Sequence, residues 1–419
     1  MAAGFSAYRA LLSDPRARAF SLAGFVARTP LSMTALGIVL LVSATTGSYA
    51  RAGLITATAT VAGAVAAPLW GRTMDRLGQA RVLVLAAVVC NVSLSVLVVT
   101  VLLGLPLVVT LVAATGVGLG FSSAGSAVRA RWAHRLQRGP LLNTAYALEA
   151  VVDEVVFMVG PVLVTFLATT LHPALGLVAC VVFGLIGALA LASMRDTQPP
   201  TRTPAEVAAT TKVALSGRLL IPVVAASAAL GALFGAMELV VVAFAREAGI
   251  PQYTGVIVMA WAFGSLIAGL LTGTVAWRAS PAQRFRGGAL LLAFSVLPLP
   301  FAGDPWLVTA LLTLSGFFIA PTLIASVAVT QSAVPSTRLT EALGWTSTGM
   351  AAGVAAGAAG LGYVVDLAGA QAGFWGVVAI GGLLIGTALC VRTPAVPGAQ
   401  PGGAQPGVEA RPVSELERS

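Results

Sequence analysis

Residues 49–103 read YARAGLITATATVAGAVAAPLWGRTMDRLGQARVLVLAAVVCNVSLSVLVVTVLL, and this stretch decides the class of fold. Two apolar runs, at about 49–70 and 80–103, flank a short segment that carries basic residues. Each run has the length of about 20 residues that an α-helix needs to cross the hydrocarbon core of a bilayer. The stretch therefore predicts two membrane-spanning helices joined by a tight turn at the membrane surface.

The same pattern continues along the 419 residues, of which 58% are hydrophobic and only 9% are charged. So few charges cannot cover a soluble protein of this length, and long apolar runs must face lipid. We expect an all-α integral membrane protein with twelve spans in two six-helix bundles. The expected parts are a cytoplasmic N-terminal segment at 1–18, a first bundle at 19–194, a cytoplasmic linker at 195–217, a second bundle at 218–391, and a disordered cytoplasmic tail at 392–419. The predicted spans lie at about 19–43, 49–70, 80–103, 106–128, 140–170, 173–194, 218–245, 252–276, 285–302, 305–331, 336–365 and 370–391.

The positions of the basic residues predict the orientation of these spans. With both termini in the cytoplasm, all but three of the 24 Lys and Arg residues fall on the cytoplasmic side. The exceptions are Arg51 and Arg246, which flank external ends, and Arg28, which lies within the first span. Insertion into the cell membrane thus explains the net charge of +9, and we expect no nucleic-acid partner.

The loop between the second and third spans carries a recognisable pattern: Gly71, Asp75, Arg76, Gly78 and Arg81. It resembles the signature loop of the major facilitator superfamily, G-x-x-x-D-R-x-G-R-[RK]-[RK], and the resemblance extends over roughly residues 19–391. The second half keeps a weaker copy of the loop at 273–278. The resemblance implies a gating role, in which Asp75 contacts the start of the eleventh span near 335–337; alternatively, the loop only sets the topology.

The fifth span resembles the drug-antiporter branch of that family. Gly160 and Pro161 match part of the branch's motif and suggest a helix kink, whereas Val112 stands where the branch carries an arginine in the fourth span. The segments 129–132 and 144–161 resemble uncharacterised actinobacterial efflux-type members, which are the closest resemblance we find. This likeness favours export over uptake and indicates no particular solute.

Charged residues inside predicted spans are the strongest candidates for function, because a charge in the membrane is costly. The fifth span contains Glu149, Asp153 and Glu154, of which the first two share a helix face and Glu154 points away. Arg28 of the first span lies at a similar depth and could pair with Glu149 or Asp153. We expect either proton coupling by these carboxylates or a structural ion pair that holds two helices in register.

The second half offers one further intramembrane carboxylate, Glu238 of the seventh span, together with Phe234 and Phe318 as presumed cavity residues. Glu238 could bind a cation or an amine of the solute, or could pair with Arg246. Polar candidates for the cavity in the first half are Thr34, Ser122 and Ser123. Two glycine runs resemble points where helices cross, at Gly116, Gly118 and Gly120 and at Gly353, Gly357 and Gly360.

These features predict a secondary transporter that moves a small organic solute across the cell membrane, with proton-coupled efflux as the preferred direction. Uptake is the nearest alternative, and a transport-inactive sensor or scaffold is the second. We expect no enzyme, because no nucleophile–base set is visible, and no cofactor. The three cysteines and two histidines lie apart and predict no metal site. The expected partners are the solute, protons and the lipid bilayer, with the protein as a monomer.

Overall fold

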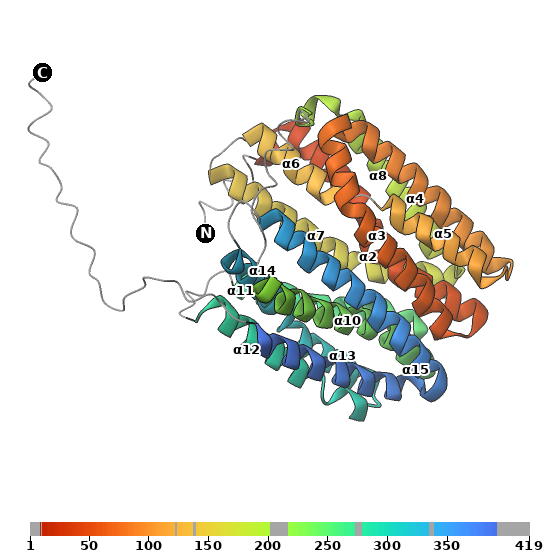
Figure 1. Cartoon of the computed structure of the whole chain (residues 1–419). Helices are drawn as coiled ribbons and strands as arrows, with labels where there is room; N and C mark the ends of the chain where they lie inside the picture. Colours follow the sequence, from red (N-terminus) through yellow and green to blue (C-terminus); the bar gives the residue numbers. More distant parts are fainter. Residues whose placement is uncertain are drawn as a thin grey trace, which may run out of the picture.

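A computed structural model describes residues 9, 11–121, 124–136, 140–201, 217–272, 279–334 and 339–391. Throughout these ranges the regular structure is helical, and no strand occurs in them (Figure 1). Half of the predicted N-terminal segment, most of the linker and all of the tail lie outside the described residues. Ser122, Ser123, the second-half loop 273–278 and the predicted start of the eleventh span at 335–337 also lie outside them.

The first half of the chain forms a series of long helices that turn back on one another. They are α2 (Pro15–Thr46), α3 (Tyr49–Leu77), α4 (Gln79–Leu102), α5 (Leu107–Gly120), α6 (Ala124–Leu136), α7 (Pro140–Phe166) with the π-helical turn η1 (Leu167–Leu171), and α8 (Leu175–Ser193). The 3-10 turn η2 (Arg195–Thr197) follows. The fourth span was predicted as one helix at about 106–128, and this was wrong in two respects. The helix breaks at Phe121, and its second part, α6, ends at Leu136.

The second half repeats this plan. Its helices are α10 (Gly217–Glu247), η3 (Pro251–Tyr253), α11 (Thr254–Thr272), α12 (Pro281–Ser295), η4 (Leu299–Phe301), α13 (Pro305–Gly316), α14 (Ile319–Ala333) and α15 (Leu339–Cys390). The predicted tenth span breaks into α13 and α14 at Phe317 and Phe318. Helix α15 is in fact two helices that meet at Gly369, whose φ of 77° is left-handed, and this break falls in the predicted gap between the last two spans.

Twelve membrane crossings follow from these helices. By length and apolarity, ten candidate spans occur in the described residues, and the one at Ala342–Cys390 holds two crossings because of the break at Gly369. The segment formed by α12 and η4 supplies the remaining crossing between α11 and α13. The expected twelve-helix fold is therefore confirmed.

Local sequence signals explain where several helices begin. Asp14 caps α2 by accepting a hydrogen bond from the Arg16 amide, and Pro15 occupies the first helical position. Ser48 caps α3 in the same way, and Asp304 caps α13. Ser280 and Gln283 form a reciprocal capping box at the start of α12.

Glycines allow several helices to pack backbone against backbone. A Cβ added at Gly353 or Gly357 of α15 would run into the backbone of Ala228 or Ala232 of α10, and one at Gly118 would meet Ala59 of α3. These positions are crossing points, as the glycine runs predicted. Gly360 is an exception, since nothing lies within 4 Å of an added Cβ there. The prediction for Gly360 was wrong because it lies on a face of α15 that no neighbouring helix covers.

The two halves lie side by side, the first coloured red to yellow-green and the second green to blue (Figure 1). Helix α3 contacts α15, and α7 contacts α11. We call the end of the molecule where α2 begins and α3 turns into α4 the near end. The far end is where α2 turns into α3 and where α15 breaks at Gly369. The contacts of α3 with α15 at Gly53 and Gly362 lie toward the far end.

Candidate solute cavity and its charge network

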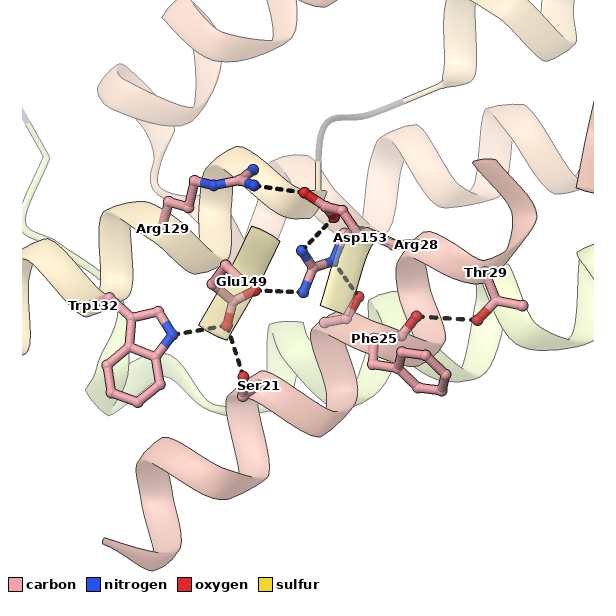
Figure 2. Close-up of polar contacts among 9 residues, drawn as sticks. Ser21, Phe25, Arg28, Thr29, Arg129, Trp132, Glu149 and Asp153 are labelled. Carbon is pink, nitrogen blue, oxygen red and sulfur yellow. Dashed lines mark hydrogen bonds and ion pairs between the residues drawn. The ribbon is translucent and has the colours of Figure 1, made fainter. Parts of the chain in front are cut away.

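Four charged side chains from three helices of the first half meet in one network. Helix α2 contributes Arg28, α7 contributes Glu149 and Asp153 one turn apart, and α6 contributes Arg129 (Figure 2). The one-turn spacing on α7 places both carboxylates on the face that packs against α2. Both expected pairs, Arg28 with Glu149 and Arg28 with Asp153, are present at the same time.

Glu149 is completely buried, and both of its carboxylate oxygens accept hydrogen bonds. Its Oε1 atom accepts from the Ser21 hydroxyl at 2.7 Å and from the Trp132 indole N–H at 2.8 Å, while Oε2 accepts from Arg28 at 2.5 Å. Trp132 itself is 1% exposed and packs edge-on against Phe20, with ring centroids 4.8 Å apart. Glu149 is thus held by one ion pair and by two neutral hydrogen-bond donors.

Arg28 is 4% exposed, and each of its three guanidinium nitrogens donates a hydrogen bond. The Nε atom donates to the Gly24 carbonyl at 3.0 Å, Nη2 donates to Glu149, and Nη1 donates to Asp153 at 2.7 Å. The planar guanidinium thus holds both carboxylates in a fixed relative position.

Asp153 differs from Glu149 because it is shared and partly open. Its second oxygen accepts from Arg129 Nη2 at 2.5 Å, and the side chains of Asp153 and Arg129 are 30% and 39% exposed. Figure 2 shows Asp153 held between Arg28 and Arg129, which approach it from different helices. The network therefore has a sealed part at Glu149 and an accessible part at Asp153.

The accessible part lines a cavity of about 430 Å³. Its walls come from α2, α3, α5, α6 and α7, and are mostly small or apolar, with Arg28, Arg129 and Asp153 as the charged residues and Thr34, Thr56 and Thr60 as hydroxyl groups. Thr34 therefore lies at the cavity as expected. The α2 residues that line it end at Ile38, five residues before Ser43, whose carbonyl accepts from Arg246 of α10 at the far end.

Sequence reasoning missed three members of this network: Ser21, Trp132 and Arg129. Arg129 was counted among the cytoplasmic surface charges, because the fourth span was predicted to end at residue 128. Helix α6 instead continues to Leu136 and directs Arg129 to Asp153. The spacing of Arg129 and Trp132 places them on one face of the helix, but it does not indicate which residues they contact. Glu154, the third acidic residue of α7, makes no ion pair among the described residues.

The second-half candidates do not line this cavity. From Ala229 to Ala245, every residue of α10 is buried except Phe234 and Glu238, which are half-buried and one turn apart. Phe234 packs edge-on against Trp261 with ring centroids 5.4 Å apart. Glu238 forms no ion pair in the described part of the chain, and the alternative partner Arg246 instead donates to the Ser43 carbonyl at 2.5 Å. Phe318 lies half-buried at the break between α13 and α14.

The predicted gating loop lies at the near end. Gly78 has a φ of 85° and provides the turn from α3 to α4, and Arg76 lies in the last turn of α3. Gly71, Asp75 and Arg81 are exposed. The expected partner of Asp75 at 335–337 lies outside the described residues, so its gating role stays a prediction.

An interaction that the sequence did not predict anchors this loop. Arg131 of α6 is fully buried and donates to the Gln79 side chain at 2.9 Å and to the Thr197 hydroxyl at 2.7 Å. The Ala80 amide donates to Gln198 at 3.0 Å. The start of α4 is thereby tied to the segment that leaves α8.

Gly160 and Pro161 lie at two helix contacts. An added Cβ at Gly160 would meet Ser32 of α2, whose hydroxyl donates to the Val156 carbonyl at 2.8 Å. The Pro161 carbonyl lies against Gly255 of α11. Helix α7 continues through this pair to Phe166 before the π-helical turn, so the pair packs α7 against both neighbours.

Twelve crossings in two repeated halves, with a charged cavity among the helices, define a helical membrane transporter. The family profile described as Major Facilitator Superfamily matches residues 20–305 and 251–419. The chain belongs to the major facilitator superfamily.

Solved structures of transporters share this fold at low sequence identity. The human organic anion transporter MFSD10 (TETRAN) matches with 18% identity and a TM-score of 0.61, covering 90% of this chain and 100% of that one. A variant of the nucleoside transporter NupG matches with 14% identity and a TM-score of 0.72, covering 89% and 98%. A variant of the peptide transporter POT with sulfate matches with 13% identity and a TM-score of 0.66, covering 89% and 92%. No curated protein sequence matches the chain significantly.

Proposed function

We propose that this protein is a proton-coupled secondary active transporter that exports a small organic solute across the cell membrane by alternating access. In this proposal both termini are cytoplasmic, the near end faces the cytoplasm, and the protein acts as a monomer in the bilayer. The observation that carries the proposal is the position of Asp153, a partly exposed carboxylate in the cavity wall that is shared by two arginines.

In this proposal Glu149 keeps its charge throughout the cycle, whereas Asp153 gains and loses a proton. Glu149 is fully buried and accepts from three donors, so we expect it to neutralise Arg28 throughout the cycle. Asp153 can take a proton from the cavity, because Arg28 keeps Glu149 as its partner when Asp153 becomes neutral. Protonation of Asp153 would then release Arg129 and change the charge of the cavity wall. A conformational preference that depends on this proton is what coupling requires.

The residues that line the cavity indicate the polarity and charge of the solute. The cavity wall is mostly apolar with a few hydroxyl groups, which suits a lipophilic or weakly polar compound. We infer that Glu238 and Phe234 of the second half bind a positively charged group of this solute, since Glu238 lacks a basic partner in the described part. The Gly160-Pro161 pair, which resembles the drug-antiporter motif, supports export. The named structural neighbours carry chemically different solutes, so the shared fold does not select one.

The test begins with a compound panel, screened in cells that lack or overproduce the protein. The solute so identified is then followed in reconstituted vesicles with an imposed pH gradient. We expect the gradient to drive transport by the parent protein, and Asp153→Asn to abolish this stimulation while leaving downhill solute exchange. Glu154→Gln, one residue along the same helix, is the matched control and should retain coupling. Stimulation that survives Asp153→Asn would contradict the proposal, and movement toward the cytoplasm would favour uptake.

A further inference from the structure

The two halves meet at the far end through a carboxylate of one half and a helix start of the other. Asp366 lies near the end of the first helix of α15, three residues before the break at Gly369. Its Oδ1 atom accepts from the Tyr49 amide at 2.6 Å, and Oδ2 accepts from the Ala50 amide at 2.9 Å and the Ser48 hydroxyl at 2.7 Å. These donors form the N-terminus of α3, which belongs to the first half.

This arrangement matches the physics of helix starts. The first amides of a helix lack partners within the helix and carry a partial positive charge, so a carboxylate there is stabilising. Ser48 already caps its own helix by accepting from the Arg51 amide at 3.2 Å. The amides of Tyr49 and Ala50 are left for a partner outside α3, and Asp366 supplies it across the boundary between the halves.

The backbones of α3 and α15 lie close together beside this contact. A Cβ added at Gly362 of α15 would meet the Tyr49 carbonyl, and one at Gly53 of α3 would meet the Ala358 carbonyl. Arg246 of α10 adds a further link by donating to the Ser43 carbonyl of α2. No solute can pass between α3 and α15 at the far end while these contacts hold.

We propose that Asp366 is a gating residue, whose contact with Ser48, Tyr49 and Ala50 holds the far end closed and must break before the far end opens. We call this contact the Asp366 clasp. The proposal rests on the alternating-access function proposed above. Losing the carboxylate charge weakens the closed state only, because the clasp joins the halves only when the far end is closed. The ratio of open to closed far ends should therefore rise exponentially with the stabilisation that is lost.

Paired spin labels can measure this shift at both ends of the molecule. The far-end pair is Thr46→Cys with Ala248→Cys, and the near-end pair is Arg72→Cys with Gln331→Cys; all four positions are exposed. The native cysteines Cys90, Cys180 and Cys390 are first replaced by alanine. Asp366→Asn should raise the ratio of long to short far-end distances roughly tenfold, a typical effect of losing a charged cap. Short near-end distances should rise in step, whereas unfolding would broaden both distributions.

Asp304→Asn is the matched control, since Asp304 also caps a helix start but does so within its own half. It should leave both distance distributions unchanged. Gly362→Ala gives an independent test, because the added methyl group would press on the Tyr49 carbonyl and should open the far end in the same direction.

The outcomes separate the clasp from the transport cycle. If Gly362→Ala populates the open far end and Asp366→Asn leaves the parent distribution unchanged, the clasp is wrong and alternating access stands. The clasp is also overturned if Asp304→Asn shifts the distances as much as Asp366→Asn does. If no variant or parent sample shows a second distance population at either end, the proposed function itself fails.

Discussion

Arg28 joins α2 to α7, because two of its three guanidinium nitrogens donate to carboxylates of α7 and the third donates to the Gly24 carbonyl of its own helix. Its pairing with α7 was predicted from its depth and from the family resemblance, which implies that spans one and five are neighbours. A lone arginine in a membrane span needs an opposite charge. The sequence could not predict that Trp132 and Ser21 complete the shell around Glu149. Those contacts depend on how α6 packs on α2 and α7, which no spacing within one helix reveals.

We predict that Glu149→Gln destabilises the protein by about 3–5 kcal/mol, because it removes one of the two carboxylates that pair with the buried guanidinium of Arg28. Thermal unfolding in detergent would measure the loss. Replacing both residues, as in Arg28→Met with Glu149→Met, should recover part of it, because no buried charge is left alone. A Glu149→Gln protein as stable as the parent would show that the pair carries little of the stability.

Asp14 gives a pH-dependent prediction outside the membrane spans. Desolvation alone would raise the pKa of Asp14, but hydrogen bonds from Arg135 and from the Arg16 and Ala17 amides lower it overall. A folded pKa below the unfolded value of about 3.9 stabilises the fold above that pH, and the benefit is lost as pH falls through the folded pKa. Asp14→Asn should therefore cost roughly 1 kcal/mol at pH 7. Unfolding midpoints of the two proteins should converge as the pH falls through the folded pKa of Asp14, and a constant difference would argue against this role.

At the scale of helices, apolar run lengths predicted the number of crossings but not their internal breaks. The fourth and tenth spans each contain a break, at Phe121 and at Phe317–Phe318, inside continuous apolar sequence. Pro321 marks the second break, because proline lacks the amide N–H that would bond to the Phe317 carbonyl. No proline or charge lies at the first break, at Phe121. The break at Gly369 was easier to place, since small residues and Asp366 interrupt the apolar run there.

Glycine contacts between helices allow a paired test on α15. Gly353→Ala should destabilise the protein by roughly 1–3 kcal/mol, because the new Cβ would overlap the Ala228 backbone of α10. Gly360→Ala, two turns along the same helix, should be neutral or stabilising by up to about 1 kcal/mol, since alanine favours the helix and the site is open. The folded fraction after heating, measured by size-exclusion chromatography, would compare them. Equal losses for both variants would contradict this account of α10–α15 packing.

At the scale of the whole molecule, the two halves carry different parts of the proposed cycle. The first half contains the cavity and the network of Arg28, Glu149, Asp153 and Arg129. The second half contributes Glu238, which has no basic partner in the described part of the chain, and Asp366, which bonds to α3 across the boundary. A proton taken up by Asp153 would have to alter the balance between two arrangements of these halves.

The most direct test of this account is solute-driven proton movement in vesicles that contain the purified protein and a pH-sensitive dye in the lumen. With a solute gradient imposed and no initial pH difference, we predict that protons move opposite to the solute in the parent protein. The same gradient should move no protons through Asp153→Asn, although the solute still equilibrates. Proton movement of equal size in both proteins, or solute transport by the parent without any proton movement, would contradict the central claim.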